Sequence, residues 1–262
     1  MPPFLSYEDK NPGDSSRVPL VLVHGHPFDR TMWAPQLAAF SAGRRVIAPD
    51  LRGYGASPVT PGTVPLSRHA QDIEELLGFL EADSFVLAGL SMGGQIAMEC
   101  YDRFGDRVRG LVLADTFPDP ETPEGRHGRR AMADRLLAEG LRGYADEVLE
   151  KMVAPYADPE VKAHVHRMMT ATSPEGAAAA LRGRAERPDY RPLLTRVTVP
   201  ALVVVGADDT YTPVADAEAM HAALPDSVLH VVGGAAHMPN LERAEEFNGV
   251  LGKFLTAVDS RS

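Results

Sequence analysis

Short apolar runs alternate with helix-like segments along the first part of the chain. The runs stop at a glycine, histidine, proline or aspartate and occupy residues 20–23, 45–48, 85–88 and 111–114. Such runs are typical of strands that are buried on both faces of a sheet. Residues 33–40 and 66–80 between them predict helices, the second from the spacing of its apolar residues, and residues 4–9 predict a short edge strand. Strands that alternate with helices indicate a parallel sheet.

The strand pattern stops at about residue 117 and returns only after residue 192. The intervening segment predicts four helices, at residues 129–138, 144–153, 160–170 and 175–185. Beyond it, strands are expected at 201–205 and 228–232, and helices at 214–224 and 241–254. The chain is therefore expected to form an α/β fold: a doubly wound, mostly parallel sheet of about seven or eight strands, interrupted once by a helical insertion.

This pattern divides the chain into a core in two parts, residues 1–116 and 193–262, and a helical cap, residues 117–192. The insertion leaves the sheet at the end of the strand near Ala114. In open parallel sheets the chemistry takes place at the carboxyl ends of the strands. The insertion is therefore placed to cover a functional site.

The segment from Gly89 to Gly93 carries the clearest chemical signal. Its sequence, Gly-Leu-Ser-Met-Gly, follows an apolar run and precedes a helix-like run, which is the strand–turn–helix context of a nucleophilic serine, Ser91. Glycines at both ends let strand and helix approach closely around a sharp turn. An ordinary Gly/Ser turn remains the alternative on this pentapeptide alone.

Two later strands are followed by residues that such a serine needs. Asp208 and Asp209 come after residues 201–205, and His237 comes after residues 228–232 and a glycine-containing turn. The order Ser, Asp, His along the chain is that of a catalytic triad on this type of sheet. Taken singly, the aspartates could be turn residues and the histidine a bystander, as could Asp115, a second candidate for the acid. A serine, an aspartate and a histidine that each lie beyond a predicted strand, in this order, favour the triad over three unrelated residues.

At this point the chain resembles the α/β-hydrolase fold family over almost its full length. The resemblance is closest to small bacterial serine carboxylesterases, enol-lactone hydrolases and cofactor-free haloperoxidases, which are also perhydrolases. It is carried by His24-Gly-His-Pro27, Asp50-Leu-Arg-Gly-Tyr-Gly-Ala-Ser57, Gly89-Leu-Ser-Met-Gly93, Gly206-Ala-Asp-Asp-Thr-Tyr-Thr-Pro213 and Gly233-Gly-Ala-Ala-His237.

The resemblance implies a role for each matching residue. Ser91 is the nucleophile, His237 the base, and Asp209 the acid, since the family's acid stands at D-x-x-T-P. The backbone N–H groups of His26 and Met92 form the oxyanion hole. An aromatic residue often takes the place of His26 in the family, so its imidazole could alter substrate preference or titrate. The family's first strand is not evident here, which makes seven strands plausible.

Composition narrows the possible partners. A net charge of −10 without any basic stripe argues against nucleic acid, and 44% apolar residues fit a globular protein. The sequence has no metal-ligand spacing and no dinucleotide fingerprint, so we expect neither a metal nor a cofactor. The single cysteine, Cys100, fits a reducing compartment. With no leader-like start and no apolar stretch of about 20 residues, a cytoplasmic protein without membrane contact is predicted. The oligomeric state stays open.

These residues predict a serine hydrolase that cleaves a carboxylic ester or lactone of a small molecule through an acyl-enzyme. The same triad could instead serve perhydrolysis, acyl transfer or hydrolysis of a C–C bond. A hypothesis of another class is a non-catalytic small-molecule receptor on the same fold. The natural substrate is not encoded in any motif of the sequence.

Overall fold

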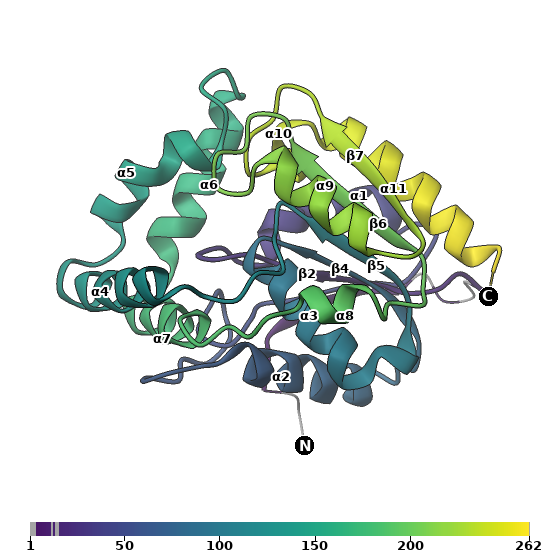
Figure 1. Cartoon of the computed structure of the whole chain (residues 1–262), viewed down its shortest axis with the longest axis horizontal. Helices are drawn as coiled ribbons and strands as arrows, with labels where there is room; N and C mark the ends of the chain where they lie inside the picture. Colours follow the sequence, from purple (N-terminus) through teal and green to yellow (C-terminus); the bar gives the residue numbers. More distant parts are fainter. Residues whose placement is uncertain (1–3, 12, 14–15, 262) are drawn as a thin grey trace.

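A single sheet of seven strands organises the computed structural model, which describes residues 4–11, 13 and 16–261. Its spatial order is β1-β3-β2-β4-β5-β6-β7, and all strands run parallel except β1, which pairs antiparallel with β3. Figure 1 labels β2, β4, β5, β6 and β7 of this sheet. The strands are β1 (Tyr7–Lys10), β2 (Leu20–Val23), β3 (Val46–Pro49), β4 (Phe85–Leu90), β5 (Val108–Ala114), β6 (Ala201–Gly206) and β7 (Ser227–Val232). The expected doubly wound α/β sheet is confirmed, at the lower end of the predicted strand number.

Predicted and observed strands differ mainly at their ends. The first strand begins at Tyr7 rather than at residue 4, and β5 begins three residues before the predicted run. The missed start of β5 contains Arg109, an exposed residue that breaks the apolar pattern. Edge position explains β1, because only one of its sides is paired and its side chains are half-buried.

The two faces of the sheet have separate apolar cores. Along each central strand the residues alternate between them: Val21 and Val23 pack on one face, whereas Leu20 and Leu22 pack on the other. This period of two is the geometry of a strand that is covered on both sides. The continuous apolar runs in the sequence therefore correspond to strands with no solvent-facing side.

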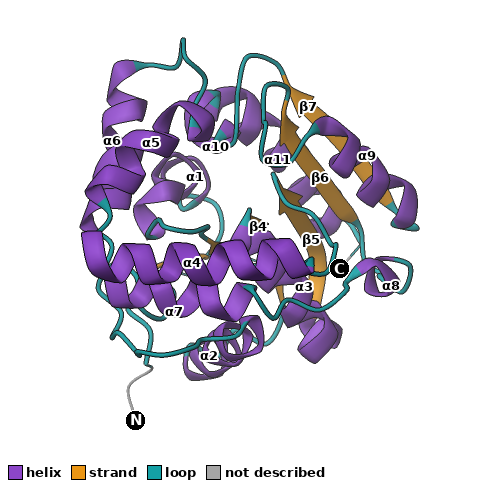
Figure 2. Cartoon of the chain, turned by 60° about the vertical axis from the view of Figure 1, so that its left-hand side comes forward, coloured by secondary structure: helices purple, strands orange, loops and turns teal. Residues whose placement is uncertain are grey.

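Helices cover both faces of the sheet (Figures 1 and 2). One face carries α2 (Leu66–Phe79), α3 (Met92–Phe104), α8 (Arg191–Leu194) and α9 (Val214–Ala223). The other face carries α1 (Ala34–Phe40), α10 (Pro239–Glu242) and α11 (Ala244–Asp259). Short 3-10 turns occupy Arg30–Trp33 and Gly105–Arg107.

The insertion between β5 and β6 contains the four predicted helices. They are α4 (Pro123–Glu139), α5 (Arg142–Met152), α6 (Pro159–Ala171) and α7 (Pro174–Arg184), and Figure 1 shows them together beyond one end of the sheet. Helices α4 and α7 pack on each other through a small apolar cluster that includes Leu136 and Leu181. The division into core and cap domains remains a prediction.

Helix α7 is held tightly against the core. A Cβ atom at Gly176 would lie 2.0 Å from the carbonyl oxygen of Gly53, and one at Gly183 would lie 1.7 Å from that of Val64. The Val64 N–H also donates to the carbonyl of Ala179 at 3.0 Å. These backbone contacts fix the position of α7, along its length, against the loop between β3 and α2.

No helix among the described residues is long and apolar enough to cross a membrane. Residues 1–3, part of the segment that was read as lacking a leader, lie outside the described part of the chain. The cytoplasmic location stays a prediction.

His69 on α2 is a buried histidine whose environment disfavours the protonated form of its ring. It is almost fully buried, and neither ring nitrogen has a hydrogen-bond partner among the described residues. Burial, reinforced by His24, Arg52 and Arg68, lowers the pKa of His69 to about 3. The folded protein therefore holds this imidazole neutral over a range in which the unfolded chain takes up a proton.

This difference makes a prediction about acid stability. The stability that folding gains by keeping His69 neutral is fully present above the unfolded pKa of about 6.5. It is lost as the pH falls from there toward 3, at up to about 1.4 kcal/mol per pH unit. His69→Leu should therefore reduce the loss of unfolding free energy between pH 7 and pH 5 by about 2 kcal/mol. Urea unfolding at both pH values measures it. His127→Leu, at an exposed position, is the control and should lose as much unfolding free energy between pH 7 and pH 5 as wild type does. An equal loss in all three proteins would contradict the assignment of this acid sensitivity to His69.

Candidate active site

Ser91 lies at the junction of β4 and α3, where the chain turns sharply. Its backbone has φ 56° and ψ −119°, a left-handed φ that is strained for a residue with a side chain. Two hydrogen bonds hold it there: its N–H donates to the carbonyl of Ala114 at 2.9 Å, and the Thr116 hydroxyl donates to the Ser91 carbonyl at 2.7 Å. The neighbouring strand thus maintains the conformation that projects the serine from the sheet.

The glycines on either side of Ser91 are required by close backbone contacts. A Cβ atom at Gly89 would lie 2.1 Å from the carbonyl oxygen of Gly93, and one at Gly93 would lie 2.1 Å from that of Val23. No side chain of any size fits at these distances. Gly25 also approaches Ser91, since its Cβ would be 3.2 Å from the serine Cβ. The loop after β2 therefore lies directly beside the turn.

Asp209 and His237 are brought together from two different strand ends. The distance from His237 Nδ1 to Asp209 Oδ2 is 2.7 Å, and both residues are buried. The other carboxylate oxygen of Asp209 accepts from the N–H groups of Tyr211 (2.7 Å) and Thr212 (3.2 Å), and the Thr212 hydroxyl donates to Oδ2. Burial by itself raises the pKa of Asp209, but His237 and these donors outweigh it and lower that pKa. Asp209 is therefore an ionised orienting group for the imidazole.

Asp115, the second candidate for the acid, lies beside this pair. Its Oδ1 accepts from the N–H of Gly206 at 2.8 Å, and a carboxylate oxygen of each aspartate and a ring nitrogen of His237 all lie within 4.8 Å of one another. Burial, followed by the charge of Asp209, raises the pKa of Asp115 well above its ordinary value. The pKa values of the two carboxyl groups are therefore shifted in opposite directions, and the Oδ1 atom of Asp115 supports the end of β6.

Glu242, on α10, holds the loop that carries His237. Its Oε1 accepts from the N–H groups of Ala236 (3.0 Å) and Met238 (3.2 Å), the two neighbours of the histidine. Its Oε2 accepts from the N–H of Ala154 at the end of α5, at 2.7 Å. One carboxylate therefore fixes the histidine loop and ties it to the insertion.

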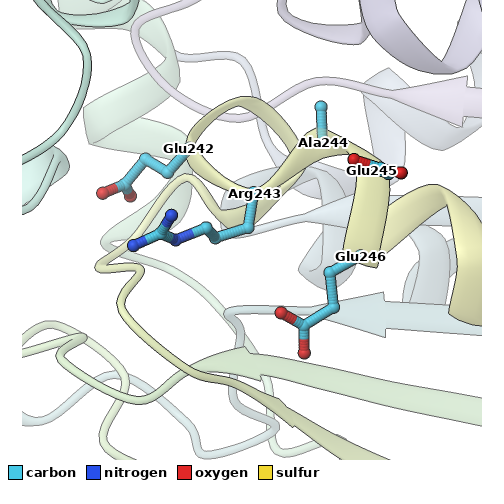
Figure 3. Close-up of a pocket in the computed structure, with 5 residues that line it drawn as sticks. All are labelled: Glu242, Arg243, Ala244, Glu245 and Glu246. Carbon is cyan, nitrogen blue, oxygen red and sulfur yellow. The ribbon is translucent and has the colours of Figure 1, made fainter.

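Glu242 also lines a surface hollow of about 470 Å³, and Figure 3 shows the residues that line it. The other residues that line this hollow are Arg243, Ala244, Glu245 and Glu246, from the start of α11. It contains no nucleophile and shares no lining residue with the cavity at Ser91. The chemistry of the molecule is therefore not expected there.

The cavity at Ser91 has a volume of about 190 Å³ and lies between the core and the insertion. Ser91 and His237 both line it, although no hydrogen bond joins them among the described residues. The remaining lining residues are His26, Phe117, Arg129, Tyr144, Met152, Leu181, Arg184, Tyr211 and Thr212. Apolar, aromatic and cationic groups from the cap therefore face the polar groups at the strand ends.

His26 supplies a neutral imidazole to this cavity. Its Nδ1 lies 2.7 Å from the Tyr54 hydroxyl, and burial, with help from Arg184, lowers the pKa of His26 well below its ordinary value. Among the described residues neither the His26 N–H nor the Met92 N–H donates a backbone hydrogen bond. His26 lines the cavity, and Met92, which directly follows Ser91, is the first residue of α3, at the positive end of the helix dipole.

Comparisons with known proteins agree with this geometry. The model of the "Alpha/beta hydrolase family" matches residues 20–250. The chain belongs to the alpha/beta hydrolase family.

Its relatives include esterases and lactonases. The chain is 28% identical to a 3-oxoadipate enol-lactonase 2 of Acinetobacter baylyi, over 90% of this chain and 88% of the relative. It is 31% identical to a pimeloyl-[acyl-carrier protein] methyl ester esterase of Chromobacterium violaceum, over 89% of this chain and 90% of the relative. A solved thermophilic esterase from Thermogutta terrifontis, with malate bound, has a TM-score of 0.94 and 38% identity over 97% of this chain and 94% of its own. The prediction of an α/β-hydrolase enzyme is confirmed.

Several groups in the site of this alpha/beta hydrolase were not predicted from sequence. No motif marks Glu242 or Arg184, which reach the distant residues Ala154 and Gln95, respectively. Tyr144 packs against the apolar cluster between α4 and α7 and also lines the cavity. Met168 and Met169 do pack in an apolar core, whereas Tyr156 is exposed.

Proposed function

We propose that this alpha/beta hydrolase cleaves a carboxylic ester or lactone of a small molecule, with Ser91 as nucleophile, His237 as base and Asp209 as orienting acid. One observation carries the proposal: a serine on a strained turn lines the same cavity as a histidine whose Nδ1 is 2.7 Å from an ionised aspartate. Relatives named enol-lactonase and methyl ester esterase support this reaction class.

In the first half of the reaction, His237 takes the proton of the Ser91 hydroxyl as the oxygen attacks the substrate carbonyl. Asp209, bonded to Nδ1, holds the ring so that Nε2 faces the serine and stabilises the imidazolium that forms. Ser91 and His237 line one cavity without a hydrogen bond between them among the described residues; catalytic hydrogen bonds of this kind often tighten only in substrate complexes.

The negative charge that develops on the carbonyl oxygen requires hydrogen-bond donors. We assign this role to the N–H groups of Met92, which directly follows the serine, and His26, which lies on the loop beside it; among the described residues neither donates a backbone hydrogen bond. The N-terminus of α3 adds a favourable field at the same place. Each such donor contributes about 3–4 kcal/mol in comparable hydrolases.

Collapse of this intermediate expels the alcohol, which receives the proton from His237, and leaves an acyl-serine. Water, deprotonated by the same histidine, then attacks the acyl carbonyl and releases the acid and free Ser91. For a lactone, the leaving alcohol remains part of the product. Every proton in the cycle passes through His237.

Removal of the nucleophile tests the proposal. Ser91→Ala should lower kcat for p-nitrophenyl acetate by a factor on the order of 10⁶, because the triad residues act as a unit. It should also abolish labelling by a fluorophosphonate. Ser260→Ala, at an exposed position on the end of α11, is the matched control and should keep both. Labelling or turnover that survives in the Ser91 variant would overturn the proposal.

The two buried aspartates give a second prediction. Asp209→Asn should lower kcat by about 10⁴, since an amide cannot orient and stabilise the imidazolium. Asp115→Asn should cost less than about tenfold, because an amide resembles the neutral carboxyl group already present. Steady-state kinetics of both variants measures this. The reverse order of effects would show that Asp115 is the acid.

A further inference from the structure

Arg184, at the end of α7, is a buried cation without an anionic partner. Only 8% of the residue is exposed, and it lines the cavity that contains Ser91. No carboxylate in the described part of the chain forms an ion pair with it; its Nε donates to the amide oxygen of Gln95 at 3.2 Å. A buried guanidinium normally has a carboxylate partner, because burial of an unpaired charge is costly.

The neighbouring side chains add to the unpaired positive charge of Arg184 rather than neutralise it. Arg129 and Arg187 lie close by, and Glu121, a carboxylate beside them, is already ion-paired with both. Burial and the charges of these two arginines lower the pKa of Arg184 well below its ordinary value. The cavity wall therefore has a surplus of positive charge in a protein whose net charge is −10.

The position of Arg184 is fixed from both sides. Gly183, the residue before it, packs against the backbone of Val64 with no room for a side chain. Gln95, which accepts its hydrogen bond, lies four residues after Ser91 on α3. A rigid, desolvated guanidinium that is held relative to the nucleophile is how a protein recognises a planar anionic group.

From this placement we propose that Arg184 binds a carboxylate of the substrate, so that the enzyme prefers small esters or lactones that carry a free carboxylate. The inference rests on the proposed function and specifies its substrate class. The ester carbonyl lies at Ser91, and the carboxylate pairs with the free nitrogens of the guanidinium. The cavity volume of about 190 Å³ restricts the chain between the two groups to a short one.

Matched pairs of esters test the preference. The anionic members are the monomethyl esters of succinic, glutaric and adipic acid; in each neutral partner an isopropyl group replaces the carboxylate. Wild type should show at least tenfold higher kcat/KM for the anionic member of the best pair. Arg184→Met should lower kcat/KM for that ester by about 10- to 100-fold more than for its neutral partner, mainly through KM.

Two further variants separate a binding role from a structural one. Arg182→Met, two residues earlier on α7 and paired with Asp134 at 2.7 Å, should leave the anionic-to-neutral ratio at its wild-type value. Arg184→Lys should retain part of the preference, because it keeps the charge but not the planar geometry. The Tm of Arg184→Met should be equal to or above that of wild type, whereas removal of a structural arginine would lower it.

Binding without turnover gives an independent measurement. Glutarate or adipate should raise the Tm of wild type in a concentration-dependent way and should not raise that of Arg184→Met. If wild type hydrolyses neutral esters through Ser91 but shows no preference in any pair and no rise in Tm with a dicarboxylate, the carboxylate site is refuted and the proposed hydrolase function is not. A dicarboxylate shift that depends on Arg184, with no ester turnover, would support the anion site and refute the hydrolase proposal.

Discussion

The contact between the end of β4 and the start of α3 is the constraint on which the rest of the site depends. The backbone atoms of Gly89, Gly93 and Val23 lie so close that no side chain can be introduced. This contact forces Ser91 into a left-handed conformation, which hydrogen bonds to the neighbouring β5 segment maintain. A strained serine is thereby presented at the carboxyl edge of the sheet, and the positive end of α3 and the loop after β2 lie beside it. The strain is supported by the buried parallel strands at the centre of the sheet.

Buried carboxylates organise the loops around this edge. Asp209 orients His237, Asp115 supports the end of β6, and Glu242 holds the amides on both sides of the histidine. Asp50 has a similar role near the serine, since it accepts from the N–H groups of Arg30 and Ala56, both at 2.8 Å. Acidic side chains that accept from loop amides replace the hydrogen bonds that regular secondary structure would provide. Much of the rigidity of the site therefore comes from side chains that take no part in the proposed chemistry.

The sequence predicted the sheet and the strand-end residues well, because both depend on local patterns. Apolar runs reveal strands, and Ser91, Asp209 and His237 each lie in the turn that follows such a run. The start of β5 was missed because Arg109 interrupts its apolar pattern. Arg184 had no local signal, since an arginine near the end of a helix ordinarily faces solvent. Only the docking of α7 against the backbone of Val64, a contact between distant segments, turns it toward the cavity.

The cavity thus combines a strained nucleophile, two unpaired backbone donors and an excess of positive charge, all suited to an acyl group with an anionic end. The central claim is that Ser91, His26 and Met92 act together on one carbonyl carbon. A crystal structure of the protein after reaction with a fluorophosphonate tests it most directly. We expect phosphorus bonded to the Ser91 oxygen, and the phosphonyl oxygen within hydrogen-bond distance of the N–H groups of His26 and Met92. An adduct on another residue, or a phosphonyl oxygen directed away from both groups, would contradict the account.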